Sequence, residues 1–398
     1  MKKLRFKDFN EDWKHLKVKD LLLERNVKTP KSEDYPLMSF IAYEGVVPKG
    51  KRYNREFLVN DESNKKYKRT EYDDFIYSSN NLETGSIGLN KYGKASISPV
   101  YSIFQKTSNS AINFISQMML RREFINKMIR WRQGVVYGQW RIHESNFIKI
   151  EVKVPCIDEQ RKIGNFLSSI DKLVGKQKEK VCLLKEIKKS YLHKIFNQEL
   201  RFKDENEEGY PDWKSETMND FAEVISGGTP STENDSYWNG DIFWFTPTEI
   251  GINKYIATSK KMITKLGMKK SSAKLVPCNS ILLTTRATIG EMSINLTECT
   301  TNQGFQSLVT KQGTKVDYLY YLLGTKKKEM IKYSNGSTFI EISHREMIKL
   351  PLLKACENEQ EKIGDFLSFL DKKIEAQESK FSQYEQLKKG YMQRLFAD

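Results

Sequence analysis

Basic and aromatic side chains stand next to one another in several short stretches of this chain, such as 51–55 (KRYNR) and 130–132 (RWR). Lys and Arg neutralise phosphate groups and aromatic rings stack on bases, so this mixture favours a nucleic acid as the partner. The net charge of +15 also points to an acidic partner. The alternative is a basic surface that is merely solvated.

Arg286 is the residue best suited to contact a base. It follows the apolar run 280–284 and precedes a Thr-Ile-Gly turn, so we expect it at the end of a strand. An Arg in the major groove can donate to guanine O6 and N7, which contributes ~1–3 kcal/mol of discrimination. A buried ion pair or a phosphate contact is the alternative.

Polar residues in turn segments supply the other DNA-binding candidates of the second half. Asn and Gln can recognise adenine, although Asn also commonly caps a turn. Gly227 and Gly228 predict a tight turn whose neighbours donate to phosphates. The candidates are Ser226, Thr229, Thr288, Asn302 and Gln303.

In the first half the candidates come from local chemistry alone. The segment 133–138 (QGVVYG) is a glycine-flanked loop between basic residues, so it could approach a DNA backbone closely. Lys51 and Arg52 are interpreted as phosphate contacts. The full set is Lys51, Arg52, Arg55, Lys91, Lys94, Arg132, Gln133, Tyr137 and Arg141.

The sequence offers no convincing catalytic motif. The segment 45–52 nearly matches a phosphate-binding loop, but Arg52 stands where Ser or Thr would hold magnesium. Asp171 with 186–188 has a nuclease-like spacing, yet it falls on a predicted helix, where we expect solvated side chains. The four histidines have no Asp or Glu at metal-binding spacing. We therefore expect no active site and no cofactor in this chain.

Cysteine usage and the absence of long apolar runs predict the compartment. The five cysteines are an odd number without a Cys-x-x-Cys pair, which disfavours a disulfide framework or a zinc site. The first residues lack the apolar core of a signal peptide, and no run approaches the ~18 apolar residues of a membrane span. We expect a cytoplasmic protein.

The chain repeats itself at a spacing of about 200 residues. Segment 159–171 (EQRKIGNFLSSID) recurs as 359–371 (EQEKIGDFLSFLD), with nine of thirteen positions identical, and LRFKD occurs at both 4–8 and 200–204. Two matches in the same order indicate a duplication.

Each repeat ends in a predicted helix of ~40 residues, near 157–197 and 357–397. Apolar residues recur there at alternating steps of three and four, which is typical of a coiled-coil seam. If a pseudo-two-fold axis relates the halves, the two helices are antiparallel. Lys188 and Lys388 interrupt the two seams at the same place, as do Gln177 and Gln377. They either fix the register or reach past the seam to solvent.

The segments before the helices contain short strand-like runs and late helical patches, which predicts a mixed α/β domain in each half. The strand-like runs are 75–77, 95–98, 101–104, 242–245 and 280–284, and the helical patches are 111–132 and 316–333. The predicted boundaries are a first α/β domain at 1–155, a long helix at 156–198, a linker at 199–213, a second α/β domain at 214–351 and a second long helix at 352–398.

The chain resembles the specificity subunits of type I restriction–modification systems over essentially its whole length. Segments 225–231 (ISGGTPS), 285–290 (TRATIG) and 302–305 (NQGF) are similar to the recognition-domain motifs of that family, and the repeated EQxKIGxFL is similar to its spacer. The first half lacks the Gly-Gly-Thr-Pro turn and a clear Asn-Gln-Gly-Phe. The resemblance implies two mixed α/β recognition domains joined by antiparallel coiled-coil helices.

The same resemblance implies function and partners. Such a subunit binds double-stranded DNA, two methyltransferase subunits and, in some systems, two restriction–translocase subunits, which hold S-adenosylmethionine, ATP and magnesium. Because the two domains differ, the recognised site would be bipartite and asymmetric. The alternatives are a DNA-binding coiled-coil protein without these partners, and a fused DNA nuclease or methyltransferase.

Overall fold

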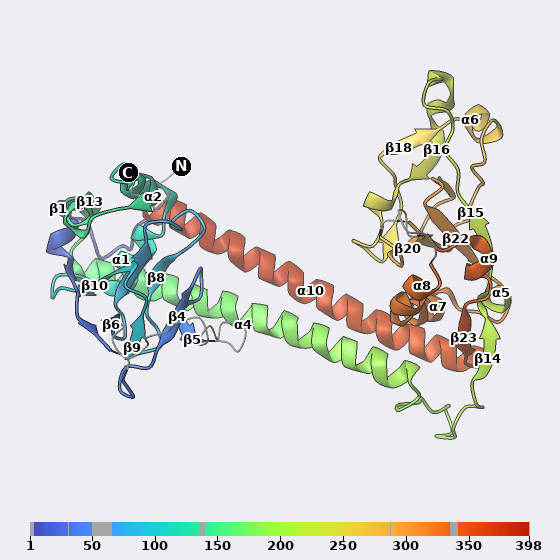
Figure 1. Cartoon of the computed structure of the whole chain (residues 1–398), viewed down its shortest axis with the longest axis horizontal. Coiled ribbons are helices and arrows are strands. Elements are labelled where there is room, and N and C mark those ends of the chain that lie inside the picture. Colours follow the sequence, from blue (N-terminus) through green and yellow to red (C-terminus); the bar gives the residue numbers. More distant parts are fainter. Residues whose placement is uncertain are drawn as a thin grey trace. The chain divides into compact units, whose positions relative to one another are not determined.

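The computed structural model describes residues 4–30, 32–49, 66–134, 140–286, 288–334 and 341–397. The chain forms two compact units: unit 1 comprises residues 1–178 and 380–398, and unit 2 comprises residues 179–379. Each unit holds one mixed α/β domain together with parts of both long helices, α4 (Ile157–Phe196) and α10 (Glu357–Leu395) (Figure 1).

A four-stranded antiparallel sheet with the order β2-β10-β7-β8 lies at the centre of unit 1. All four residues of β7 are buried, because its apolar sequence has a strand on either side and a hydrophobic core against it. The strands are β2 (Leu22–Glu24), β7 (Phe75–Ser78), β8 (Ile87–Leu89) and β10 (Tyr101–Lys106).

Smaller sheets and short helices complete unit 1. The order β3-β6-β9 forms a second sheet, and β1 with β13, β4 with β5 and β11 with β12 form antiparallel pairs. The strands are β1 (Lys14–Lys17), β3 (Lys28–Thr29), β4 (Met38–Ile41), β5 (Gly45–Pro48), β6 (Tyr67–Thr70), β9 (Ala95–Ile97), β11 (Gln133–Gly134), β12 (Trp140–Arg141) and β13 (Glu151–Val154). The helices are α1 (Ile112–Met119), α2 (Arg122–Ile129) and α3 (Glu144–Phe147).

Unit 2 is built around the strand order β15-β22-β19-β20-β17. Its first four strands are antiparallel, as in unit 1, and β17 adds a parallel edge. These strands are β15 (Ala222–Ser226), β17 (Tyr255–Ile256), β19 (Ile281–Thr284), β20 (Met292–Asn295) and β22 (Phe305–Thr310). The repeat therefore extends into segments whose sequences no longer resemble each other.

The remaining elements of unit 2 follow the same plan, with a three-stranded sheet, one antiparallel pair and short helices. The strands are β18 (Lys261–Ile263), β16 (Trp238–Phe245) and β21 (Cys299–Thr301), with β14 (Lys214–Thr217) paired to β23 (Pro351–Lys354). The helices are α5 (Met218–Phe221), α6 (Lys265–Lys269), α7 (Val316–Thr325), α8 (Lys327–Lys332) and α9 (His344–Met347). The strand and helix runs expected from the sequence are thus confirmed.

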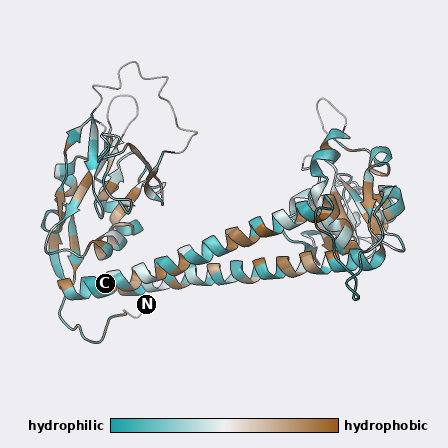
Figure 2. Ribbon diagram, turned by 90° about the horizontal axis from the view of Figure 1, so that it is seen from below, coloured by the Kyte–Doolittle hydropathy of each residue, from teal (hydrophilic) through white to brown (hydrophobic). Residues whose placement is uncertain are grey.

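The long helices pack in antiparallel fashion within each unit. In unit 1 the rings of Phe166 and Tyr391 lie 4.9 Å apart between centroids. In unit 2 the rings of Tyr191 and Phe366 lie 5.0 Å apart. Apolar and polar residues alternate along both helices (Figure 2), as a seam with a wet outer face requires. The predicted fold class, mixed α/β domains with antiparallel helices in an internal repeat, is confirmed.

Ion pairs between the two long helices distinguish the two alternatives for the repeated lysines, fixing the register or extending into solvent. Lys388 lies 2.6 Å from Asp171 in unit 1, and Lys188 pairs with Asp371 in unit 2. Both lysines therefore bind the opposite helix, as a device that fixes the register would, and do not simply extend into solvent. The expectation that Asp171 is plain solvated surface was wrong, because Gln117 also donates to it at 2.6 Å.

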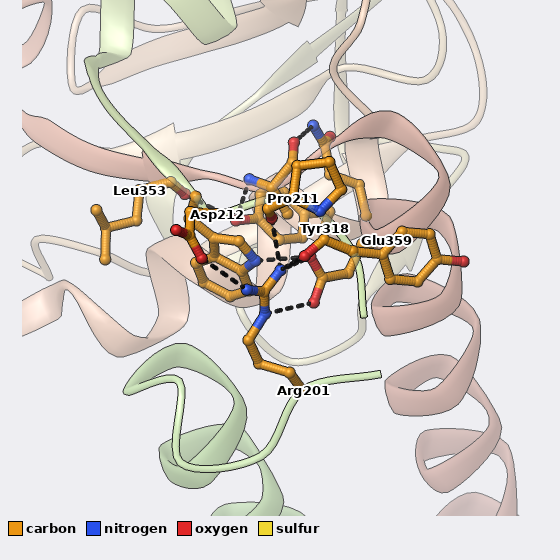
Figure 3. A network of polar contacts seen from close by, with 10 residues as sticks. Arg201, Pro211, Asp212, Tyr318, Leu353 and Glu359 are labelled. Carbon is orange, nitrogen blue, oxygen red and sulfur yellow. Dashed lines mark hydrogen bonds and ion pairs between the residues drawn. The ribbon is translucent and has the colours of Figure 1, made fainter. Parts of the chain in front are cut away.

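The repeated LRFKD and EQxKIG motifs form a joint between each domain and its helix. In unit 1 Arg5 donates to the buried carboxylate of Glu159 at 2.9 and 2.8 Å. In unit 2 Arg201 donates to Glu359 at 3.2 and 2.8 Å (Figure 3). The strongest sequence repeat in the chain is thus structural: it holds the start of each repeat on the long helix that ends it.

The Gln and Gly of the same motif complete the joint. Gln160 accepts from the backbone nitrogen before α1 at 3.1 Å, and Gln360 does the same before α7 at 2.9 Å. These bonds satisfy donors at helix N-termini that would otherwise lack a partner. A Cβ on Gly164 would lie 2.7 Å from a backbone nitrogen of α1, so glycine is required for this close approach.

Candidate nucleic-acid interface

The candidates of the second half gather at one edge of the unit 2 sheet. The residue after β19, the end of β15 and the turn before β22 meet there because β22 is antiparallel to both neighbours. Backbone bonds from Gly228 to Thr301 and from Thr285 to Gly304, both 2.8 Å, hold these turns together. We call this set the polar edge of unit 2; it comprises Ser226, Thr229, Arg286, Thr288, Asn302 and Gln303.

Exposure separates the members of this edge into available and engaged side chains. Ser226, Thr288 and Gln303 are exposed. Gln303 accepts a hydrogen bond from the Thr229 hydroxyl, which leaves its amide nitrogen to donate. The Asn302 carbonyl oxygen accepts from the nitrogen of Gly304 at 2.9 Å, so this side chain stabilises the turn.

Gly227 and Gly228 allow two backbone segments to come close. A Cβ on Gly227 would lie 2.0 Å from the backbone oxygen of Asn302, and one on Gly228 would lie 2.3 Å from the nitrogen of Ala273. Any side chain would push β15 away from the turn before β22. These glycines shape the polar edge through close backbone approach.

Arg286 leaves the end of β19 as expected and is 45% exposed. Its Nε lies 2.9 Å from Glu341, and the two residues are also paired through their backbones in an antiparallel bridge. The ion pair foreseen as an alternative is therefore present, but it is half-exposed and not buried. The guanidinium edge with the two terminal nitrogens is not used by this pair.

The corresponding edge of unit 1 is a polar cavity of about 420 Å³. It lies where β7 ends and β10 begins. In strand order and direction this place is equivalent to the end of β19 and the start of β22. We call it the polar edge of unit 1. Its lining includes Lys28, Lys68, Asn80, Trp140, Arg141 and Glu144.

Of the candidates predicted in the first half, Arg141 lines this cavity. Gln133, another candidate, is paired with Arg141 across the β11–β12 strands. Arg141 is 56% exposed and lies 3.7 Å from Glu144. Burial alone would raise the pKa of Glu144, but its hydrogen bonds and the nearby Lys68 and Arg141 lower it. The cavity therefore combines a fixed carboxylate with two cations.

Three other predicted residues of the first half are differently placed. Arg132 donates two hydrogen bonds to Glu83, at 2.8 and 2.6 Å, and its side chain is only 11% exposed. Lys91 pairs with Asp73 at 2.6 Å, beyond the opposite end of β7 from Arg141. Lys94 directly precedes β9, at the end where Ala95 pairs with Thr70 of β6. Lys94 is not among the residues that line the cavity.

The position of Lys91 has a counterpart in unit 2. Lys91 contacts Asn113 near the start of α1, as the buried Lys254 contacts Asp317 near the start of α7. Burial lowers the pKa of Lys254, and hydroxyl groups of α7 and α10 surround its ammonium group. By this comparison Lys91 faces the helix joint and not the polar edge.

Sequence reasoning missed several residues of the unit 1 edge. Asn80 lies just beyond the end of β7, the same kind of place that singled out Arg286, and accepts from the nitrogen of Trp140 at 2.5 Å. The strand-end signal could have found Asn80. Lys28 and Lys68 reach the cavity only through strand pairing. The candidates Lys51, Arg52, Arg55 and Tyr137 lie outside the described residues.

The described residues hold no group of three or more His, Cys, Asp or Glu side chains that could bind a metal ion. The near match to a phosphate-binding loop begins as β5, a strand paired with β4, and not as a loop before a helix. Within the described ranges no helix is both long and apolar enough to cross a membrane.

Comparison with known proteins identifies a family whose model matches both halves of the chain. The model of the family described as type I restriction modification DNA specificity domain matches residues 10–183 and again 210–383. The MjaIX specificity subunit of Methanocaldococcus jannaschii is 39% identical over 45% of this chain and 43% of its own length. The EcoR124I/EcoR124II specificity subunit of Escherichia coli is 27% identical over 57% of each chain. These alignments thus span about half of the two relatives.

A solved structure shares the whole fold. The crystal structure of the S subunit of a type I restriction–modification system from M. genitalium covers 100% of both chains with a TM-score of 0.63 and 14% identity. At this identity the likeness concerns the fold alone.

Proposed function

The chain belongs to the family of type I restriction modification DNA specificity domains, and from this membership we propose that it is the DNA-recognition subunit of a type I restriction–modification complex. It contributes sequence recognition and no catalytic step. Its substrate is double-stranded DNA, and the two polar edges are the surfaces that meet the bases.

One observation carries this proposal: the same sheet edge recurs in both units with different side chains. In unit 1 the edge presents Asn80 and Arg141, and in unit 2 it presents Arg286 with Gln303. A repeated scaffold with altered contact residues suits two different half-sites. The recognised site is therefore bipartite and asymmetric, unlike the palindromes that identical half-site readers select.

The antiparallel helices set the gap between the half-sites. Helix α4 has 40 residues and α10 has 39, which corresponds to a length of ~60 Å, or nearly two turns of DNA. The inter-helix ion pairs of Lys188 and Lys388 oppose sliding of one helix along the other. A fixed helix register would give a fixed number of unread base pairs.

Partner subunits supply the chemistry. Two methyltransferase subunits with S-adenosylmethionine, and in some systems two restriction–translocase subunits with ATP and magnesium, complete the assembly in the cytoplasm. Leu183 and Leu387 are 57% and 48% exposed on the long helices. We assign the docking of the methyltransferase subunits to the long helices that carry these side chains.

Methylation mapping with a domain exchange tests the proposal. Residues 14–154 would be replaced by the matching domain of a relative, and the chain would be co-expressed with its methyltransferase subunit. Sequencing of the host DNA should show a split adenine-methylated motif in which only one half-site changes. A change in both half-sites would contradict the modular assignment, and methylation that persists without this chain would contradict the function itself.

A further inference from the structure

Glu341 is an unexpected residue at the polar edge of unit 2. Its carboxylate is 35% exposed beside Arg286 and lies 2.9 Å from Nε of that arginine. A negative charge close to DNA phosphates is unfavourable, so a carboxylate here weakens binding to DNA of any sequence. Its presence at the edge calls for a contribution to selectivity that offsets this cost.

The internal repeat shows that this position varies between the halves. Ile142 donates its backbone N–H to the Ser79 hydroxyl at 3.0 Å, and Ile342 donates to the oxygen of Thr285 at 3.3 Å. The residues beside these anchors are therefore equivalent. Arg141, just before Ile142, corresponds to Glu341, just before Ile342. Asn80, just after Ser79, corresponds to Arg286, just after Thr285.

The charge at the two equivalent positions is rearranged, while the scaffold is kept. In unit 1 the segment that pairs with the strand end carries the cation, Arg141, and the strand end carries the neutral Asn80. In unit 2 the cation comes from the strand end and the paired segment carries a carboxylate. Within a duplicated domain this is the pattern of a position that changes with the recognised sequence.

The paired side chains match one base pair. In the major groove a G·C pair presents two acceptors, guanine N7 and O6, followed by one donor, cytosine N4. Side by side, an arginine and a glutamate present two donors followed by one acceptor. Antiparallel backbone pairing places the two side chains next to each other, and the ion pair leaves the two terminal nitrogens of Arg286 to face the guanine.

We propose that Arg286 and Glu341 act together as the reader of a single G·C base pair in the second half-site. This rests on the proposed function and adds the base pair and a specificity-determining residue. An A·T pair presents acceptor, donor and acceptor. Arg286 would then face the N6 donor of adenine, and Glu341 the O4 acceptor of thymine, so both contacts would be repulsive.

The test is selection of bound sequences from a random duplex library by the full-length chain. Wild type, Arg286→Ala, Glu341→Gln and a control, Glu216→Gln, would be compared at one salt concentration. Glu216 is a carboxylate of unit 2 that pairs with Lys354 on the β14–β23 strands, outside the polar edge. Circular dichroism would confirm that each variant is folded.

We expect wild type to select a split motif with an invariant G·C pair in one half-site. In Glu341→Gln the new amide nitrogen can donate to thymine O4, so discrimination against A·T at that base pair alone should fall about 10-fold or more, with overall affinity kept or raised. Arg286→Ala should lose the same base pair, and the control should leave the motif unchanged. Retention of the G·C preference in Glu341→Gln, with or without a uniform change in affinity, would overturn the paired reader. Binding by wild type without any motif would overturn the proposed function as well.

Discussion

The joint between domain and helix predicts an unequal response to removing either partner of one ion pair. The Glu359 carboxylate is fully buried and accepts from Arg201 at 3.2 and 2.8 Å and from the Trp213 indole at 2.8 Å. Arg201 keeps 23% of its side chain exposed. Only the carboxylate is therefore out of reach of water when its partner is lost.

Substituting Arg201→Met leaves an uncompensated buried charge, which costs about 3–5 kcal/mol of unfolding free energy. Substituting Glu359→Gln keeps an acceptor for the indole and leaves a guanidinium that can be hydrated. It costs about 1.5–3 kcal/mol, the range for a lost hydrogen bond to a charged group. The arginine variant should be the less stable one, although its removed side chain is the more exposed.

Urea unfolding of the full-length chain, followed by circular dichroism, measures these free energies. Urea is preferred to guanidinium chloride because it does not screen charge. Arg5→Met and Glu159→Gln form the matched control, since the same ion pair occurs in unit 1 at 2.9 and 2.8 Å. The same order is expected there. If Glu359→Gln destabilises as much as Arg201→Met, the assignment of the cost to the buried carboxylate is wrong.

Further predictions concern the helix contacts, a thiol and a surface ion pair. Gly164→Ala should lower the urea midpoint more than Gly364→Ala, because its Cβ would meet a backbone nitrogen of α1 at 2.7 Å and the other a side-chain carbon at 3.1 Å; equal effects would contradict this. Burial raises the pKa of Cys299 to about 12, so iodoacetamide at about pH 8 should label it only after unfolding; labelling as fast as that of the exposed cysteines would refute it. Arg132 holds the pKa of Glu83 below its usual value, so this pair stabilises the fold above that value and the effect is lost as the pH falls through the lowered one. Stability should fall less between about pH 5 and pH 3 in Glu83→Gln than in wild type, and parallel pH profiles would argue against it.

Local patterns in the sequence were sufficient for the helices, the repeat and half of the candidate interface. Apolar side chains every three or four positions predict a helix of 40 residues, and matching sequence segments indicate a duplication. Arg286 was found because a polar residue at the end of an apolar strand run points out of the sheet, and Gln303 because an amide side chain in a turn can recognise adenine. The same rule applied to Asn80 would have found the equivalent place in the first half.

Two candidates chosen from local chemistry alone, Arg132 and Lys91, pair with carboxylates outside the polar edge. Arg132 and Lys91 are basic residues near aromatic ones, but each is bound to a carboxylate that lies far away in the sequence, Glu83 and Asp73. A positive charge in a sequence does not reveal whether a partner already neutralises it. That depends on which strands become neighbours.

The sequence by itself determined the two long helices and the alternation of strands and short helices, because these depend on residues that are close in sequence. Matching segments and the count of charged residues gave the duplication and the basic character of the chain directly. Only the tertiary structure decided that the repeated Arg-Glu motif is a joint and that Glu341 lies beside Arg286, 55 residues away. Strand pairing brings such residues together across loops of any length, and neither periodicity nor composition records which strands will pair.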